Sequence, residues 1–135
     1  MASDEYAKFG APYLERIVRS LDRSVPSIVF GVETGELLGQ LASSGAEVVG
    51  VDWRVPLSEA RRRTGPRVAL QGNLDPAALL LPREALERRV RRVLDEARAA
   101  GGGHLFNLGH GILPSTPVEN ARCVVQLVHE ETARP

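Results

Sequence analysis

The sequence has little cysteine and no excess of either charge, and each scarcity excludes a class of protein. Cys123 is the only cysteine among 135 residues, so one chain holds neither an internal disulfide nor a metal site built from several cysteines. Lys+Arg and Asp+Glu both number 17. This balance gives no electrostatic basis for binding nucleic acid or an anionic membrane surface.

Long apolar runs and nucleotide-binding motifs are also missing. No apolar run approaches the ~20 residues of a membrane span, and the acidic start at residues 1–5 has no apolar signal region behind it. The chain has neither a dinucleotide-binding glycine fingerprint nor a phosphate loop, and Lys8 is its only lysine. The sequence therefore predicts a cytoplasmic protein that binds no membrane and no nucleotide cofactor.

Four short apolar runs predict buried strands. They are rich in Val, Ile, Leu or Phe and show little polar alternation, which is typical of parallel strands covered on both faces. The runs cover residues 27–30, 47–51, 67–70 and 104–108.

Helical patterns separate these runs. The predicted helices cover residues 6–21 with a kink or boundary at Pro12, 35–43 after a Thr34 cap, 56–63, a long amphipathic stretch from Pro82 to the glycines at 101–103, and a last helix. That last helix starts at Thr116-Pro117-Val118-Glu119, a capping-box pattern. Its apolar stripe is expected to hold Val118, Ala121, Val125 and Val128.

Alternating strands and helices predict an α/β fold with a parallel sheet and right-handed crossovers. Four βα units fit a small, open, doubly wound sheet. They also fit about half of a (β/α)8 TIM barrel, which normally takes ~250 residues. Periodicity alone does not choose between these, and either way residues 1–135 are expected to form a single domain.

The unusual residues follow the predicted strands, where ligands bind in both architectures. His110 lies between Gly109 and Gly111 after the last strand, and the two glycines let backbone approach a ligand closely. Asp52 follows the second strand and is a candidate active-site carboxylate, although capping the next turn or pairing with Arg54 is the more ordinary role. Trp53 is expected to pack, Asn73 and Asp75 to serve turns and caps, His104 and His129 to be structural, and Cys123 to be a small buried apolar residue.

Three motifs, in order, resemble the uroporphyrinogen decarboxylase family. They are Val51-Asp52-Trp53, Gln71-Gly72-Asn73-Leu74-Asp75-Pro76, and the run from Asn107 through Gly109-His110-Gly111 to Asn120. Residues 6–18 resemble the family helix that follows its central serine motif. The resemblance implies a (β/α)8 barrel that acts as a homodimer. It also implies decarboxylation of the four acetate side chains of uroporphyrinogen III to give coproporphyrinogen III, with no metal or organic cofactor.

The resemblance also implies an incomplete site. His110 matches the family's late histidine, expected to hold a substrate carboxylate or propionate arm or to act as a general acid. The family's arginine-rich motif, aspartate, tyrosine and serine have no counterparts in this chain. We therefore expect a C-terminal half-barrel whose N-terminal half is absent. Such a half-barrel should associate with a second copy or pair with an N-terminal half, and it should be inactive alone.

Two alternatives stay open. The first is a barrel methyltransferase that transfers methyl groups between corrinoids and thiols, which needs a zinc site of histidine and cysteines. The second is a non-catalytic half-barrel that associates with itself.

Overall fold

The computed structural model describes residues 2–133, and four parallel strands in one sheet form its centre. The strands are β1 (Ile28–Val29), β2 (Val48–Gly50), β3 (Ala69–Leu74) and β4 (His104–Leu108). Their spatial order is β1-β2-β3-β4, and every neighbouring pair is parallel. The prediction of four βα units around a parallel sheet is confirmed.

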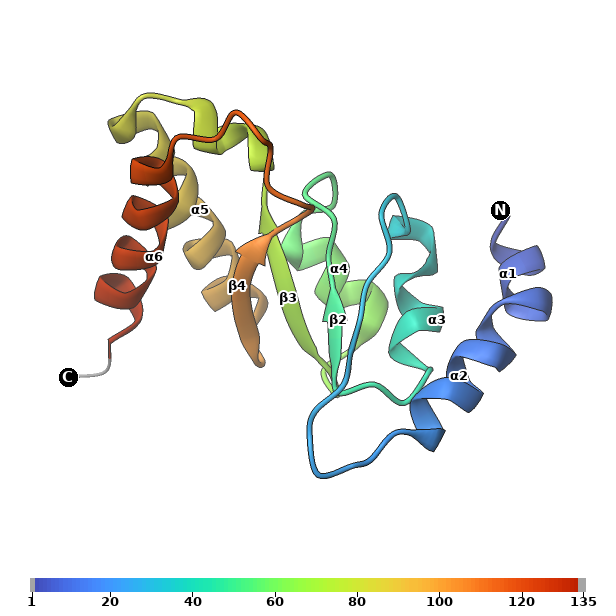
Figure 1. The fold of residues 1–135 in the computed structure, drawn as a ribbon. Coiled ribbons are helices and arrows are strands. Elements are labelled where there is room, and N and C mark those ends of the chain that lie inside the picture. The colour runs from blue at the N-terminus through green and yellow to red at the C-terminus, as the bar shows by residue number, and fades with distance from the viewer. Residues whose placement is uncertain (1, 134–135) are drawn as a thin grey trace.

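Helices connect the strands and follow one another around the sheet (Figure 1). They are α1 (Ser3–Phe9), α2 (Ala11–Ser20), the 3-10 helix η1 (Gly35–Leu37) leading into α3 (Leu38–Ala42), α4 (Leu57–Thr64), the 3-10 helix η2 (Pro76–Leu80), α5 (Arg83–Ala100) and α6 (Val118–Thr132). The boundary between α1 and α2 falls at Gly10, next to Pro12.

The strand order decides between the two architectures that periodicity left open. A doubly wound sheet reverses its strand order at a switch point, so that helices cover both faces. Here the order never reverses, and α3, α4, α5 and α6 pack in sequence, each against the next. Because right-handed crossovers then place the connecting helices α3, α4 and α5 on the same side, and α6 packs against α5, the sheet has the layout of half a (β/α)8 barrel.

The register shows what this one-sided cover does to the strands. Val29, Val49 and Leu70 occupy one row across the sheet and are at most 8% exposed, because they face the helices. The next row holds Phe30, Gly50, Gln71 and Leu105 on the uncovered face. Leu105 is 43% exposed and Phe30 is 48% exposed. The expectation that both faces are covered was therefore wrong within residues 2–133.

The core lies between the sheet and the helices in two clusters of buried side chains. One gathers around Val49, Leu57 and Leu70, and the other around Leu74, Leu86 and Leu127. Val93 on α5 packs against both clusters and so joins them. No helix within the described part of the chain combines the length and apolar character needed to cross a membrane.

Two capping predictions were wrong, and one predicted helix face was right only in part. The Thr34 hydroxyl donates back to the Gly31 carbonyl at 2.7 Å instead of capping the helix that follows. Pro117 occupies the N-cap of α6, and the Thr116 hydroxyl oxygen has no hydrogen-bond partner among residues 2–133. On α6 the predicted Ala121 and Val128 pack against the core, whereas Val118 and Val125 are each 58% exposed. The buried side chains of the helix are Cys123, Val124 and Leu127.

Candidate active site at the carboxyl ends of the strands

Hydrogen bonds tie together the loops that follow β1, β2 and β3. The backbone N–H of Glu33, after β1, donates to the Asp52 carboxylate at 2.9 Å. The Asn73 side chain, at the end of β3, donates to the Asp52 carbonyl at 3.3 Å and to the Val55 carbonyl at 2.6 Å. The polar residues that the sequence placed after separate strands therefore meet at one rim.

Asp52 is the buried charge of this rim, with only 3% of its surface exposed. Its carboxylate accepts the Glu33 and Arg54 backbone N–H groups, and Arg54 Nη1 donates to both of its oxygens at 2.8 and 3.0 Å. Burial pushes the pKa of Asp52 up, but these donors outweigh burial and hold the pKa below its ordinary value. Asp52 thus performs both ordinary roles predicted for it, capping the turn and pairing with Arg54.

Trp53 lies against residues from two directions. The Arg54 guanidinium carbon is 3.7 Å from the centroid of the indole ring. The His110 imidazole is stacked with the same ring at a centroid distance of 5.9 Å and an interplanar angle of 11°. The expected packing role of Trp53 is therefore a specific one, because its partner is the candidate catalytic residue.

His110 is exposed on the loop that leaves β4 at the carboxyl end of the sheet, as predicted. Gly109, just before it, is buried, and its N–H donates to the Leu74 carbonyl at 2.8 Å. A Cβ on Gly109 would lie 2.4 Å from the Trp53 backbone nitrogen, whereas a Cβ on Gly111 would meet nothing within 4 Å. Gly109 therefore permits a close approach to Trp53, and Gly111 is open.

A cavity of about 250 Å³, here called the site cavity, lies beside His110 on the uncovered face of the sheet. Its lining residues are Ile28, Phe30, Gly50, Gln71, Asn107, Leu108 and His110. The Gln71 side-chain oxygen is buried without a hydrogen-bond partner among residues 2–133, so it is a free acceptor in this lining. The cavity therefore combines apolar walls with an imidazole and two amides.

Sequence reasoning missed Gln71, Asn107 and Phe30 as lining residues of the site cavity. A signal for the amides was present, because Gln71 and Asn107 are polar residues inside strands that are otherwise apolar. Phe30 gave no such signal, since an aromatic residue in a strand usually packs in a core.

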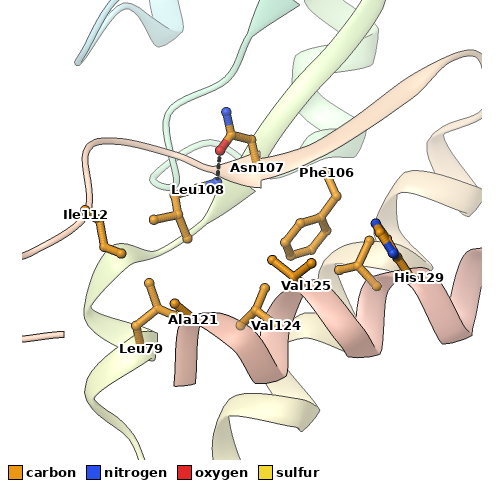
Figure 2. Close-up of a pocket in the computed structure, with 10 residues that line it drawn as sticks. Leu79, Phe106, Asn107, Leu108, Ile112, Ala121, Val124, Val125 and His129 are labelled. Carbon is orange, nitrogen blue, oxygen red and sulfur yellow. Dashed lines mark hydrogen bonds between the residues drawn. The ribbon is translucent and has the colours of Figure 1, made fainter. Parts of the chain in front are cut away.

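A second cavity of about 280 Å³, the edge groove, lies between β4 and α6 (Figure 2). Its walls are mainly apolar and include Leu79, Phe106, Ile112, Ala121, Val124, Val125 and Val128, with His129 at one end. β4 pairs only with β3 in the described chain, so its other edge is free. Gly103 and Gly109 bond to β3, so the odd-numbered residues of this strand face β3 and the N–H of Leu108 points to the free edge. There the Asn107 side-chain oxygen accepts the Leu108 N–H at 2.8 Å.

The remaining candidate groups take structural positions. His104 Nε2 lies 2.7 Å from the Gly72 carbonyl oxygen, and burial lowers the pKa of this imidazole. His129 lies in the last turn of α6, and Cys123 is buried on the same helix. Asp75 caps η2 by accepting the Ala77 N–H at 2.9 Å. Within residues 2–133, no three His, Cys, Asp or Glu side chains are grouped to hold a metal ion.

Comparisons with known proteins agree on a family. The family model described as uroporphyrinogen decarboxylase (URO-D) matches residues 1–131. The uroporphyrinogen decarboxylase of Salinispora tropica is 50% identical over 136 residues, which are 100% of this chain and 36% of that protein. The uroporphyrinogen decarboxylase of Streptomyces coelicolor is 60% identical over 110 residues, which are 82% of this chain and 31% of that protein. The chain thus spans about a third of the length of these relatives.

A solved structure, a methyltransferase from Methanosarcina mazei, has the same fold over 98% of this chain and 39% of its own. The TM-score is 0.80 and the sequence identity is 23%. At this identity the likeness concerns the fold and not the reaction.

Proposed function

Because the chain belongs to the uroporphyrinogen decarboxylase family, we propose that it forms the C-terminal part of a cytoplasmic carboxy-lyase of haem biosynthesis. Its reaction removes the four acetate carboxyl groups of uroporphyrinogen III to give coproporphyrinogen III. The observation that carries this proposal is the placement of His110, at the carboxyl end of the sheet and beside the site cavity.

The reaction requires groups that deliver a proton and groups that hold carboxylates. The pyrrole is protonated next to an acetate arm, the bond to the carboxyl carbon then breaks, and carbon dioxide leaves. The carboxylates that remain must be held by cations and hydrogen-bond donors. An exposed imidazole suits either task, because histidine changes its charge near neutral pH.

Within this chain we assign the holding of a substrate carboxylate to His110. Its side chain is exposed and lines the site cavity, and its imidazole makes no hydrogen bond to another residue among 2–133, so the ring nitrogens are available to a ligand. Asp52 is left out of substrate contact, because its oxygens are taken by Glu33 and Arg54. Gly109 and Gly111 serve by placing the imidazole rather than by direct contact.

The rest of the site must come from chain that would complete the barrel. The free edge of β4, the edge groove and the exposed valines of α6 form one surface without cover in residues 2–133. We propose the N-terminal part of the whole protein as its cover. A dimer mass for the isolated chain in light scattering would instead favour pairing of two half-barrels.

A chimaera tests the function directly. This chain replaces the segment that it matches in the Salinispora tropica protein, and uroporphyrinogen consumption and coproporphyrinogen formation are measured. We expect activity in the chimaera and a loss of roughly 10- to 150-fold with His110→Ala, because a hydrogen bond to a charged group contributes about 1.5–3 kcal/mol. Arg88→Gln, on the exposed surface of α5 and outside the site cavity and the edge groove, is the control and should stay active. A folded but inactive chimaera, or full activity with His110→Ala, would contradict the proposal.

The methyltransferase alternative draws only on the fold. Its zinc chemistry needs cysteine near the rim, whereas Cys123 lies on α6 and contacts Glu87 of α5 at 4.0 Å.

A further inference from the structure

We propose that Trp53 is a positioning residue that sets the orientation of the His110 imidazole. The inference rests on the proposed function, since it concerns how the site presents its histidine. The two residues are 57 positions apart and follow β2 and β4, which are not neighbours in the sheet. Their contact therefore crosses the end of β3.

The contact has the geometry of a directed aromatic pair. The ring centroids are 5.9 Å apart and the planes differ by 11°. Offset stacking at about 4.5–7 Å is a favoured arrangement of aromatic rings, because it avoids opposing their negative faces. An exposed imidazole would otherwise sample several rotamers, so this stack restricts the directions in which the ring nitrogens point.

The backbone at Gly109, directly before His110, is also held close to Trp53. Gly109 approaches Trp53 so closely that an added Cβ would lie 2.4 Å from the Trp53 nitrogen and 2.8 Å from its Cα. The Gly109 N–H is bonded to the Leu74 carbonyl of β3 at 2.8 Å. His110 thus starts from a fixed point directly beside the indole.

Trp53 is itself held by its neighbour Arg54. The Arg54 guanidinium lies 3.7 Å from the indole centroid, a distance suited to a cation–π contact. The same guanidinium is held by the buried Asp52 carboxylate at 2.8 Å. A chain of contacts therefore runs from Asp52 through Arg54 and Trp53 to His110.

His110 and Trp53 line different cavities, which distinguishes the residue that contacts substrate from the residue that positions it. His110 lines the site cavity, whereas Trp53 and Arg54 line another cavity of about 170 Å³. Trp53 thus acts on a substrate through His110, which makes it a positioning residue.

NMR of the histidine rings in the isolated chain tests the stack without any need for activity. The carbon-bound ring protons of His110, assigned with His110→Gln, should be shifted from those of His129, because the ring current of the neighbouring indole acts on them. Trp53→Leu should remove this shift, and Trp53→Phe should keep part of it. Phe106→Leu is the matched control, since Phe106 lies edge-on to His104 at 6.4 Å, so the substitution should change the His104 signals and leave those of His110 unchanged.

The wild-type spectrum alone already decides the matter if Trp53→Leu fails to fold. His110 ring protons without a ring-current shift of either sign in the folded wild-type chain would overturn the proposal. Signals that are equal in wild type and in a folded Trp53→Leu variant would do the same.

Activity of the chimaera gives the functional readout. We expect Trp53→Leu to lower kcat/KM about tenfold or more and Trp53→Phe to restore most of it, because a planar ring again supports the imidazole. If Trp53→Leu and Trp53→Phe had the same kcat/KM, Trp53 would not be a positioning residue. An inactive chimaera with a shifted His110 signal would instead refute the proposed function and leave the stack established.

Discussion

Replacing Gly109 with alanine would force the loops after β2 and β4 apart. The new Cβ would lie 2.4 Å from the Trp53 nitrogen and 2.8 Å from the Trp53 Cα, and backbone atoms cannot move aside as a flexible side chain can. Overpacking of this kind costs about 1–3 kcal/mol. The imidazole of His110, one residue later, would move with the loop.

Gly111→Ala is a matched control two residues away. A Cβ there meets nothing within 4 Å, and neither glycine is among the positive-φ positions of the described chain. Both substitutions reduce the freedom of the unfolded chain by a similar amount, about 0.4–1 kcal/mol in favour of folding. That gain cancels in the comparison, so Gly109→Ala should be less stable than Gly111→Ala by about 1–3 kcal/mol, or roughly 5- to 150-fold in the unfolding equilibrium.

Urea unfolding followed by circular dichroism measures the difference. With a slope of about 2 kcal/mol per molar urea, the two midpoints should lie roughly 0.5–1.5 M apart. Fluorescence of Trp53, the only tryptophan, reports on the loop directly and should change in folded Gly109→Ala but not in Gly111→Ala. Superimposable unfolding curves for the two variants would refute the close approach of Gly109 to Trp53.

Two further predictions concern the rim and the opposite end of the sheet. Asn73→Ala removes the donor to the Asp52 and Val55 carbonyls, so it should lower the free energy of unfolding by about 1–3 kcal/mol in the same urea experiment; an unchanged midpoint would contradict this. Hydrogen bonds from the Ser27 backbone and hydroxyl lower the pKa of Glu47 to about 2. Because the folded pKa is the lower one, the stabilisation is complete above the unfolded pKa and is lost as pH falls towards 2, so Glu47→Gln should flatten the pH dependence of thermal stability between about 4.5 and 2. A slope identical to that of the wild-type chain would rule out this role.

Local chemistry was enough to find most of the elements. Runs of β-branched and aliphatic residues favour buried strands, and each of the four predicted runs overlaps a strand, although β3 begins at Ala69 and extends to Leu74, past the predicted end at residue 70. The helix ends were less predictable, because a cap depends on one side-chain rotamer. Thr116 carries the capping-box pattern, yet Pro117 takes the N-cap position, and Thr34 bonds backwards to Gly31.

The sequence by itself determined that strands and helices alternate and that His110 follows the last strand. It also indicated that Asp52 caps the turn after β2 or pairs with Arg54. Only the tertiary structure decided that the connecting helices α3, α4 and α5 cover the same face, because strand order is a contact between distant segments that periodicity does not encode. For the same reason it alone brought Trp53 against His110 and left Gln71 and Asn107 facing the site cavity. Neighbours across a sheet are set by register and crossover, which no single stretch of sequence contains.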